Sequence, residues 1–247
     1  MLLTIPKGRI EEYRGQGLGT LGKGKSGILI EDFWSAEEIA EILQTLETTR
    51  ALWYFFPGVY NYSSFGNPLY AFRATNRLEE YFQKSAESDA KVQRHFPGLE
   101  EKILSPFRTI EDPKTFQKRA RHSGPAFVIQ DDRSDHYAHY DLNEGLKDIR
   151  GIFSPEDSLY TVVGMLKKPK SGGRLFLWNR LYDDTRPYID QLSTPPELEK
   201  IAIDYPLGSL LIVNGMKLHE IEESKGERIT VNCHLMRTSD DNWTYWF

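Results

Sequence analysis

Residues 209–213 read Ser-Leu-Leu-Ile-Val, and residues 228–236 read Arg-Ile-Thr-Val-Asn-Cys-His-Leu-Met. Both runs are short, rich in β-branched residues and bounded by turn-forming residues, as is typical of strands. Similar runs occur at 126–130, 159–166 and 174–178, and earlier ones at 27–31 and 69–73. Because few helical patterns separate the later runs, we predict an antiparallel sandwich or barrel from residue 125 onward. The two earlier runs are expected to join the edges of its sheet.

The first half of the chain shows helical patterns instead. Ser35-Ala-Glu-Glu38 has the spacing of a capping box, in which hydroxyl and carboxylate bond to the free amides of a helix start. Apolar residues follow at helical spacing, which predicts a helix over 36–49. Further helices are predicted around 76–95 and 98–104. We therefore expect an α+β fold with a mainly β core and helices packed outside it. It forms one domain over 1–247, in which 1–124 is mainly helical support and lid and 125–247 is the core.

Composition limits the classes of function. The 247 residues are 39% hydrophobic and 13% aromatic, which is typical of a soluble globular protein. No apolar run approaches the ~20 residues that span a bilayer, and the N-terminus lacks the basic flank of a signal peptide. The single cysteine excludes an internal disulfide and a Cys-rich zinc site. The net charge is −5, and the basic clusters at 118–121 and 167–170 are interpreted as solvated turns. We expect a cytoplasmic protein with a small-molecule substrate and no nucleic-acid or membrane partner.

One group of residues has the composition of a metal site. His139-Tyr140-Asp141 lies just beyond the run at 126–130, and His219 follows the run at 209–213 and the turn at Asn214-Gly215. Residues two apart on an extended chain point to the same side, so His139 and Asp141 can converge on one ion. Two imidazoles and one carboxylate form the facial triad of non-haem Fe(II) oxygenases. The His-x-Asp spacing alone is weak, since six histidines and 36 acidic residues give roughly one such pair by chance.

Arg228 lies nine residues after His219 and opens the last long run. Thr230, two residues further on, faces the same way on a strand. A guanidinium can grip a carboxylate with two parallel hydrogen bonds. The alternative is an ordinary surface arginine on a strand, beside Glu227.

Taken in order, His139-x-Asp141, His219 and Arg228-x-Thr230 resemble the iron(II)- and 2-oxoglutarate-dependent dioxygenases. Their surroundings are similar too. Gly172-Gly-Arg-Leu175 resembles the strand entry common between the two metal histidines, and Gly208–Val213 resembles the strand before the distal histidine. The helix at Ser35 resembles the early helix that braces such cores. The resemblance covers about 125–236 and is closest to the small-molecule branch, which includes free amino-acid hydroxylases and halogenases.

The resemblance implies a double-stranded β-helix, or jelly roll, that binds Fe(II) through His139, Asp141 and His219. 2-Oxoglutarate would chelate the iron, and Arg228 with Thr230 would hold its distal carboxylate. With O2, such an enzyme releases succinate and CO2 and hydroxylates a carbon of a small polar metabolite, here expected to be a free amino acid or a derivative. In the halogenating branch a small residue replaces the carboxylate ligand so that chloride can bind iron. Asp141 therefore favours hydroxylation over halogenation, and desaturation and ring closure stay open.

Further residues are candidates for substrate contact: His136, Arg73, Trp178, Asn232 and His234. Each of the first three has a plainer interpretation. These are a surface loop histidine, a surface arginine at a strand end, and a tryptophan packed in the core. Two other functions stay open: a peptide or protein side-chain hydroxylase of the same family, and a non-catalytic jelly-roll binding protein. Loss of activity in His219→Ala would distinguish an enzyme from a mere binder.

Overall fold

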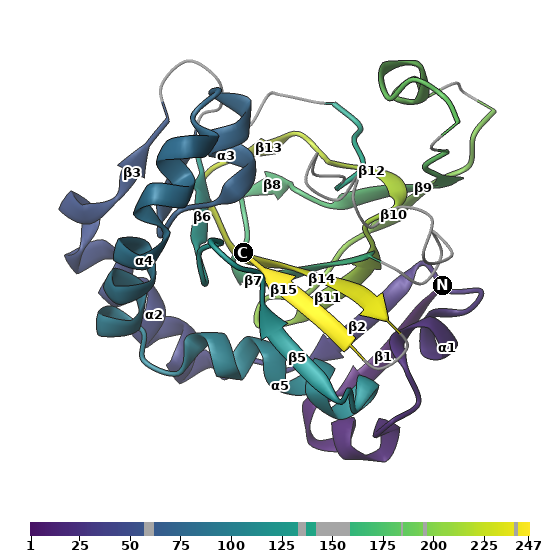
Figure 1. Cartoon of the computed structure of the whole chain (residues 1–247), viewed down its shortest axis with the longest axis horizontal. Coiled ribbons are helices and arrows are strands. Elements are labelled where there is room, and N and C mark those ends of the chain that lie inside the picture. The colour runs from purple at the N-terminus through teal and green to yellow at the C-terminus, as the bar shows by residue number, and fades with distance from the viewer. Residues whose placement is uncertain (57–61, 133–136, 142–158, 184, 195–196, 240–241) are drawn as a thin grey trace.

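The computed structural model describes all of the chain except residues 57–61, 133–136, 142–158, 184, 195–196 and 240–241. A large, mainly antiparallel sheet forms its centre (Figure 1). Its strands follow the order β1 (Leu2–Pro6), β2 (Gly27–Glu31), β11 (Leu210–Asn214), β7 (Leu159–Lys167), β14 (Arg228–Ser239), β6 (Phe127–Gln130), β4 (Tyr62–Phe65) and β3 (Tyr54–Phe55). β15 (Asn242–Trp246) pairs with β14, and β5 (Thr115–Lys118) pairs with β15 in parallel.

A small sheet faces this main sheet. Its strands are β10 (Lys200–Ile203), β9 (Leu175–Leu181) and β12 (Lys217–Ile221), and β8 (Ser171–Gly172) pairs separately with β13 (Ser224–Lys225). Apolar side chains from both sheets form one buried cluster, with Val163 and Leu211 from the main sheet and Leu177 and Ile203 from the small one. Two facing antiparallel sheets with helices outside them confirm the predicted α+β class and jelly-roll core.

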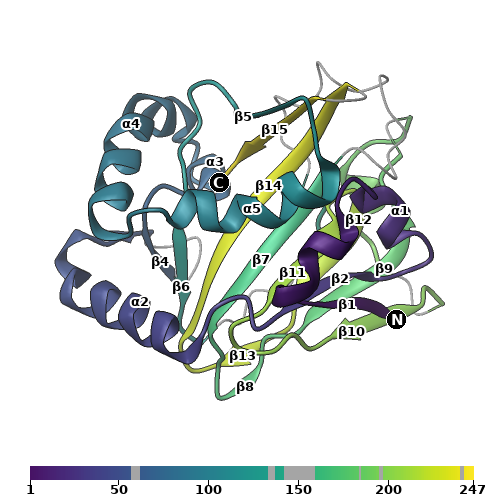
Figure 2. The same cartoon turned by 90° about the horizontal axis from the view of Figure 1, so that it is seen from below.

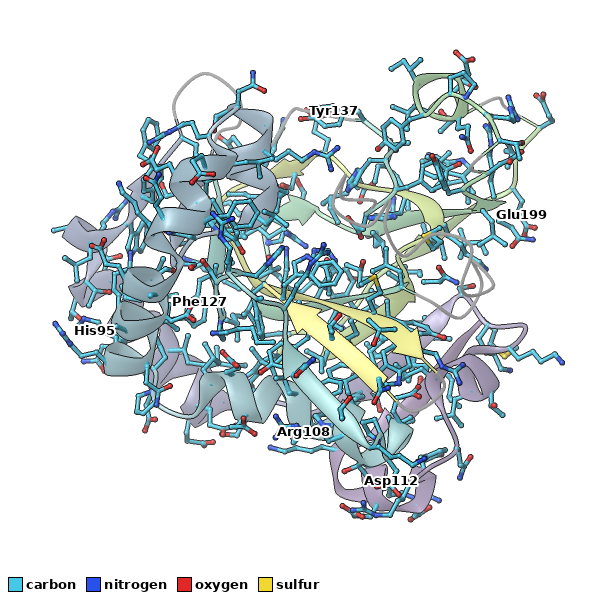
Figure 3. The ribbon with its side chains drawn as sticks, viewed as in Figure 1. His95, Arg108, Asp112, Phe127, Tyr137 and Glu199 are labelled. Carbon is cyan, nitrogen blue, oxygen red and sulfur yellow. The ribbon has the colours of Figure 1, made fainter. Side chains whose placement is uncertain are left out.

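Four of the five described helices contribute buried residues to the core cluster on the outer side of the main sheet (Figure 2), whereas α3 (Leu69–Ala74) lies on the cavity side. The four are α1 (Leu18–Gly22), α2 (Ala36–Thr48), α4 (Leu78–His95) and α5 (Leu99–Glu111). The predicted capping box begins α2, where the Glu38 amide donates to Ser35 Oγ and the Ser35 amide donates to the Glu38 carboxylate. Phe127 of β6 lies on the helix side of the sheet, 4.5 Å from Phe96 between ring centroids (Figure 3). Within the described part of the chain, no helix combines the length and apolar character needed to cross a membrane.

The long strand β14 shows how alternation positions the functional side chains. Val231, Cys233 and Leu235 are buried in the cluster that includes the apolar face of α5. The residues between them, Asn232 and His234, line a cavity on the opposite face. Because side chains alternate along a strand, one stretch of sequence supplies both the core and the polar wall of the cavity.

Three predictions about elements need correction. Residues 69–73 form the helix α3 rather than an edge strand, because Pro68 precedes it and the buried residues Leu69 and Phe72 have the spacing of one helical face. Residues 27–31 form a strand as predicted, but it lies inside the sheet between β1 and β11. Helix α5 continues beyond residue 104, with Pro106 inside it. The N-terminal half therefore contributes strands to the main sheet as well as helices.

Candidate metal centre

Reciprocal backbone hydrogen bonds bring the two predicted histidines together. His139 N donates to His219 O at 2.8 Å, and His219 N donates to His139 O at 2.9 Å. This single antiparallel bridge adds residue 139 to the edge of the small sheet beside β12. The two imidazole rings lie on the same side, 4.5 Å apart between centroids.

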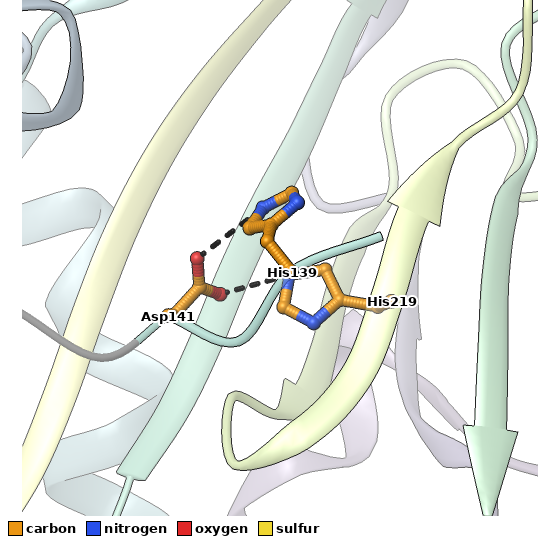
Figure 4. Close-up of side chains that lie close together, drawn as sticks. All are labelled: His139, Asp141 and His219. Atoms are coloured by element: carbon orange, nitrogen blue, oxygen red, sulfur yellow. Dashed lines mark ion pairs between the residues drawn. The ribbon is translucent and has the colours of Figure 1, made fainter. Parts of the chain in front are cut away.

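Asp141 completes the group. Its amide donates to Gly215 O at 3.0 Å, which anchors the segment to the turn before β12. Its Oδ1 lies 3.7 Å from His139 Nε2, and its Oδ2 lies 3.1 Å from His219 Nε2 (Figure 4). One ligand atom from each of the three residues falls within 4.8 Å of the other two. This is the donor set and clustering of a two-histidine, one-carboxylate metal site.

Backbone carbonyls orient both imidazoles. His139 Nδ1 lies 3.2 Å from Tyr137 O, and His219 Nδ1 lies 2.8 Å from Lys217 O. A carbonyl can only accept a hydrogen bond, so each ring donates through Nδ1–H. The lone pair of a neutral imidazole is then left on Nε2, the atom that faces Asp141. This second layer of contacts is the arrangement found around metal-ligating histidines.

The pKa values of Asp141, His219 and His234 are shifted by burial and by the charges of their neighbours. Burial acts to raise the pKa of Asp141, but the charge and hydrogen bond of His219, with the charges of His234 and His139, outweigh it and hold that pKa well below its usual range. Burial acts to lower the pKa of His219, whereas the Asp141 carboxylate and the Lys217 carbonyl raise it, and the net shift is upward. The pKa of His234 is lowered, mainly by burial, so this histidine is neutral near pH 7.

A cavity of about 380 Å³ opens onto the three residues, between the inner face of the main sheet, the small sheet and α3. Its aromatic lining includes Tyr70, Tyr137, Tyr140 and Tyr188, and Tyr137 is 45% exposed (Figure 3). Its polar lining includes Arg73, Gln130, Thr161, Arg228, Asn232 and His234. A concave site with few polar groups among apolar and aromatic walls is typical of small-molecule binding.

Arg228 provides a buried positive charge in this cavity and is only 3% exposed. Its guanidinium donates to Gln130 Oε1 at 2.9 Å and to the Tyr205 hydroxyl. Its Nε has no partner, and the described residues place no carboxylate against it. Buried charges are normally paired, so this orphaned donor and unbalanced cation fit an anionic ligand such as the distal carboxylate of 2-oxoglutarate. The surface interpretation of Arg228 is wrong.

Among the described residues, some of the other candidates line the cavity and some do not. Arg73, Asn232 and His234 line the cavity, and Arg73 does so from helix α3 rather than from a strand end. Thr230 is fully buried and lies 3.5 Å from Arg228 Nη1, but it is not among the described lining residues. Trp178 is 4% exposed in a core cluster, because it lies on the opposite face of β9 from the cavity-lining Leu175. His136 lies outside the described residues.

Sequence reasoning missed Gln130 and Tyr205, which hold Arg228, and Thr161, which bonds to Asp141. Gln130 carries a weak signal, since it is a polar residue closing an apolar run, opposite Arg228 in the observed register. Tyr205 and Thr161 carry none, because their partners depend on strand pairing that spacing does not reveal.

Comparison with known proteins gives one match over nearly the whole chain. The family model described as carrier-protein-independent halogenase WelO5 matches residues 2–247. No curated protein matches the chain in sequence. Solved structures show a similar fold. The N-substituted L-amino acid dioxygenase from Burkholderia ambifaria AMMD has a TM-score of 0.60 at 14% identity, over 93% of this chain and 89% of that one. The non-heme alpha-ketoglutarate-dependent epimerase SnoN of nogalamycin biosynthesis has a TM-score of 0.52 at 11% identity, over 93% and 86%.

Proposed function

The chain belongs to the family of the carrier-protein-independent halogenase WelO5, and from that premise we propose that it is an Fe(II)- and 2-oxoglutarate-dependent hydroxylase of a small polar metabolite. One observation carries the choice of hydroxylation. Asp141 provides a carboxylate within reach of both His139 and His219. The halogenating branch has a small residue there, which leaves room for chloride. With Asp141 as a ligand that position is filled.

Fe(II), 2-oxoglutarate and O2 are the cofactor and co-substrates of this enzyme class. When bound, they supply oxidative decarboxylation to succinate and CO2 and transfer of one oxygen atom to a substrate carbon. The chain's own residues provide binding and orientation. His139, Asp141 and His219 hold the metal through two Nε2 atoms and a carboxylate oxygen. Arg228, fixed by Gln130 and Tyr205, binds the distal carboxylate of 2-oxoglutarate.

The rest of the cavity supports a substrate of amino-acid size. At about 380 Å³ it lies near the small end of the ~300–1,000 Å³ range of ligand sites, and it must also hold 2-oxoglutarate. Arg73 on α3 suits a substrate carboxylate, while Asn232 and His234 on β14 suit polar groups across the cavity. The Burkholderia ambifaria enzyme with the same fold acts on an N-substituted L-amino acid. A free amino acid or a close derivative is therefore the substrate class we favour.

The test is turnover by the purified protein with Fe(II), 2-oxoglutarate, ascorbate and O2, in chloride-containing buffer, against a panel of amino acids and N-substituted derivatives. Succinate and product mass are measured together. Succinate that rises with one substrate, with a product heavier by one oxygen atom, is the expected result. A chlorinated product would show that Asp141 does not exclude halide.

The matched control is His219→Ala, which removes one metal ligand on β12. Turnover should disappear in this variant. No succinate from the wild-type protein with iron bound, together with unchanged ligand binding in His219→Ala, would identify a non-catalytic binding protein. If succinate forms only slowly and no amino acid increases the rate, the protein is still an oxygenase, but the proposed amino-acid substrate is wrong.

A further inference from the structure

A threonine that is not a metal ligand connects the candidate metal centre to the opposite wall of the cavity. Thr161 lies on the inner face of β7, directly opposite His234 on β14 and Val213 on β11. It is 7% exposed. Its hydroxyl donates to Asp141 Oδ2, and its Oγ1 lies 3.3 Å from His234 Nδ1. One side chain thus contacts both a candidate ligand and a cavity-lining histidine.

The direction of these hydrogen bonds follows from counting hydrogens. A carboxylate only accepts, so the single hydroxyl hydrogen of Thr161 goes to Asp141. The oxygen of Thr161 then has only lone pairs to offer His234. Nδ1 of His234 must therefore carry the hydrogen that joins the two, and in the neutral ring Nε2 carries none.

The ring of His234 is held in this orientation from its other side. Trp246 stacks on it with centroids 5.4 Å apart and planes 24° apart. His234 lines the cavity, and Nε2 has no hydrogen-bond partner in the described part of the chain. The free lone pair is thus left for a ligand of the cavity.

We propose that Thr161 is a positioning residue, which fixes the Asp141 carboxylate facing the two imidazoles and sets His234 as the Nδ1–H tautomer. His234 then offers the substrate an acceptor, so the substrate group bound there is a hydrogen-bond donor such as an amine or a hydroxyl. The metal part of this inference rests on Asp141 being a ligand, as in the proposed function. The tautomer part does not, because it concerns the metal-free protein.

Metal affinity tests the first part without turnover. Ni(II) is titrated by calorimetry into the apo forms of wild type, Thr161→Val, Thr161→Ser and a control, Thr244→Val. Thr244 lies on β15, and its buried Oγ1 has no hydrogen-bond partner among the described residues, so the control makes the same chemical change without breaking such a bond. Thr161→Val should bind Ni(II) about 10- to 100-fold more weakly, the usual effect of losing a group that orients a ligand. Thr161→Ser and Thr244→Val should bind as wild type does.

Equal Ni(II) affinity in a folded Thr161→Val would overturn the positioning role, as would a failure of Thr161→Ser to restore binding. If Thr161→Val does not fold, Thr161→Ala removes the same hydroxyl without adding a methyl group and decides the question. If the wild-type protein binds no Ni(II), the proposed metal site itself is wrong.

Long-range 1H–15N NMR of 15N-histidine-labelled apo protein tests the second part, with the His234 signals identified by their loss in His234→Phe. The wild-type protein should show hydrogen on Nδ1 of His234 and none on Nε2. Thr161→Val should lose this preference, whereas Thr161→Ser should keep it. A wild-type His234 with hydrogen on Nε2 would overturn the tautomer part of the inference whatever the metal experiment shows.

Discussion

Replacement of Arg228 by methionine tests the proposed 2-oxoglutarate site most directly. The guanidinium is buried, donates to Gln130 and Tyr205, and has no carboxylate against it among the described residues. The ligand must therefore supply the counter-charge. Arg228→Met keeps most of the apolar bulk of the side chain and removes the charge with all of its donors.

The magnitude follows from the bonds that are lost. Two charge-assisted hydrogen bonds to the distal carboxylate contribute ~1.5–3 kcal/mol each. At ~1.4 kcal/mol for each factor of ten, their loss raises the Kd for 2-oxoglutarate about 10²- to 10⁴-fold. The free energy of unfolding of the apo protein should change far less. Leaving Gln130 and Tyr205 without a donor is unfavourable, but removing an unpaired buried charge is favourable, so we expect a net change within ~2 kcal/mol.

The assay is calorimetric titration of 2-oxoglutarate into Ni(II)-loaded protein, with urea unfolding of the apo forms alongside. Arg174→Met is the matched control, because Arg174 is 45% exposed by side chain and pairs with Glu222 on the surface. Its 2-oxoglutarate affinity should equal that of wild type. A Kd for Arg228→Met within about threefold of wild type, which is under ~1 kcal/mol, would refute the assignment. A selective loss of metal affinity would show that Arg228 serves the metal centre instead.

Three further outcomes are expected. Asp141→Ala should abolish turnover and weaken Fe(II) binding in a metal titration, whereas Asp204→Ala, an exposed carboxylate paired with Lys168, should do neither; retained affinity and turnover would remove Asp141 from the site. Ni(II) affinity should rise with pH by up to ~10-fold per unit below the raised pKa of His219, because that imidazole must lose its proton to bind; an affinity that does not change with pH would contradict the raised pKa. The same shift stabilises the apo protein through the Asp141–His219 pair. This stability is fully present below the unfolded histidine pKa of ~6.5 and is lost as pH rises through the folded pKa. Ser35→Ala should lower the free energy of unfolding, measured in urea, by ~1 kcal/mol, because it removes the capping box of α2. The control is Ser105→Ala, since the Ser105 hydroxyl donates to the Lys102 carbonyl within α5, and this variant should change the free energy of unfolding less. Equal effects of the two substitutions would show that the capping box does not stabilise the fold.

The grouping of His139, Asp141 and His219 was largely predictable because much of its geometry is local. His139 and Asp141 are two residues apart on an extended segment, so their side chains face the same way without any tertiary information. The distal histidine follows a strand and a turn whose residues are recognisable in sequence. Arg228 and the cavity residues of β14 share one strand, and its alternation places them correctly. What spacing could not provide was the backbone bridge between His139 and His219, which closes the site.

The partners of these residues were not predictable, because they come from pairing between distant strands. Thr161 reaches Asp141 only through the register of β7 against β11 and β14. Tyr205 lies 23 positions before Arg228 in a loop beyond β10, and nothing in its surroundings marks it. Trp178 had two interpretations in the sequence, a cavity wall and the core. Its place on β9, three residues after the cavity-lining Leu175, turns its side chain into the core, in agreement with the plainer interpretation.

The cavity residues proposed to contact substrate and those proposed to bind metal lie on different kinds of secondary structure. The candidate metal ligands lie on backbone that is hydrogen-bonded to β12 or to the turn before it. Arg73 and Tyr70 come from α3, a helix of six residues that begins after Pro68 and is held by Leu69, Ala71 and Phe72. Short helices are marginal by themselves and depend on such packing. Substitutions at the buried face of α3 should therefore alter substrate affinity while leaving metal and 2-oxoglutarate affinity unchanged. This separation would let one family keep a common oxygen-activating centre and vary the molecule it acts on.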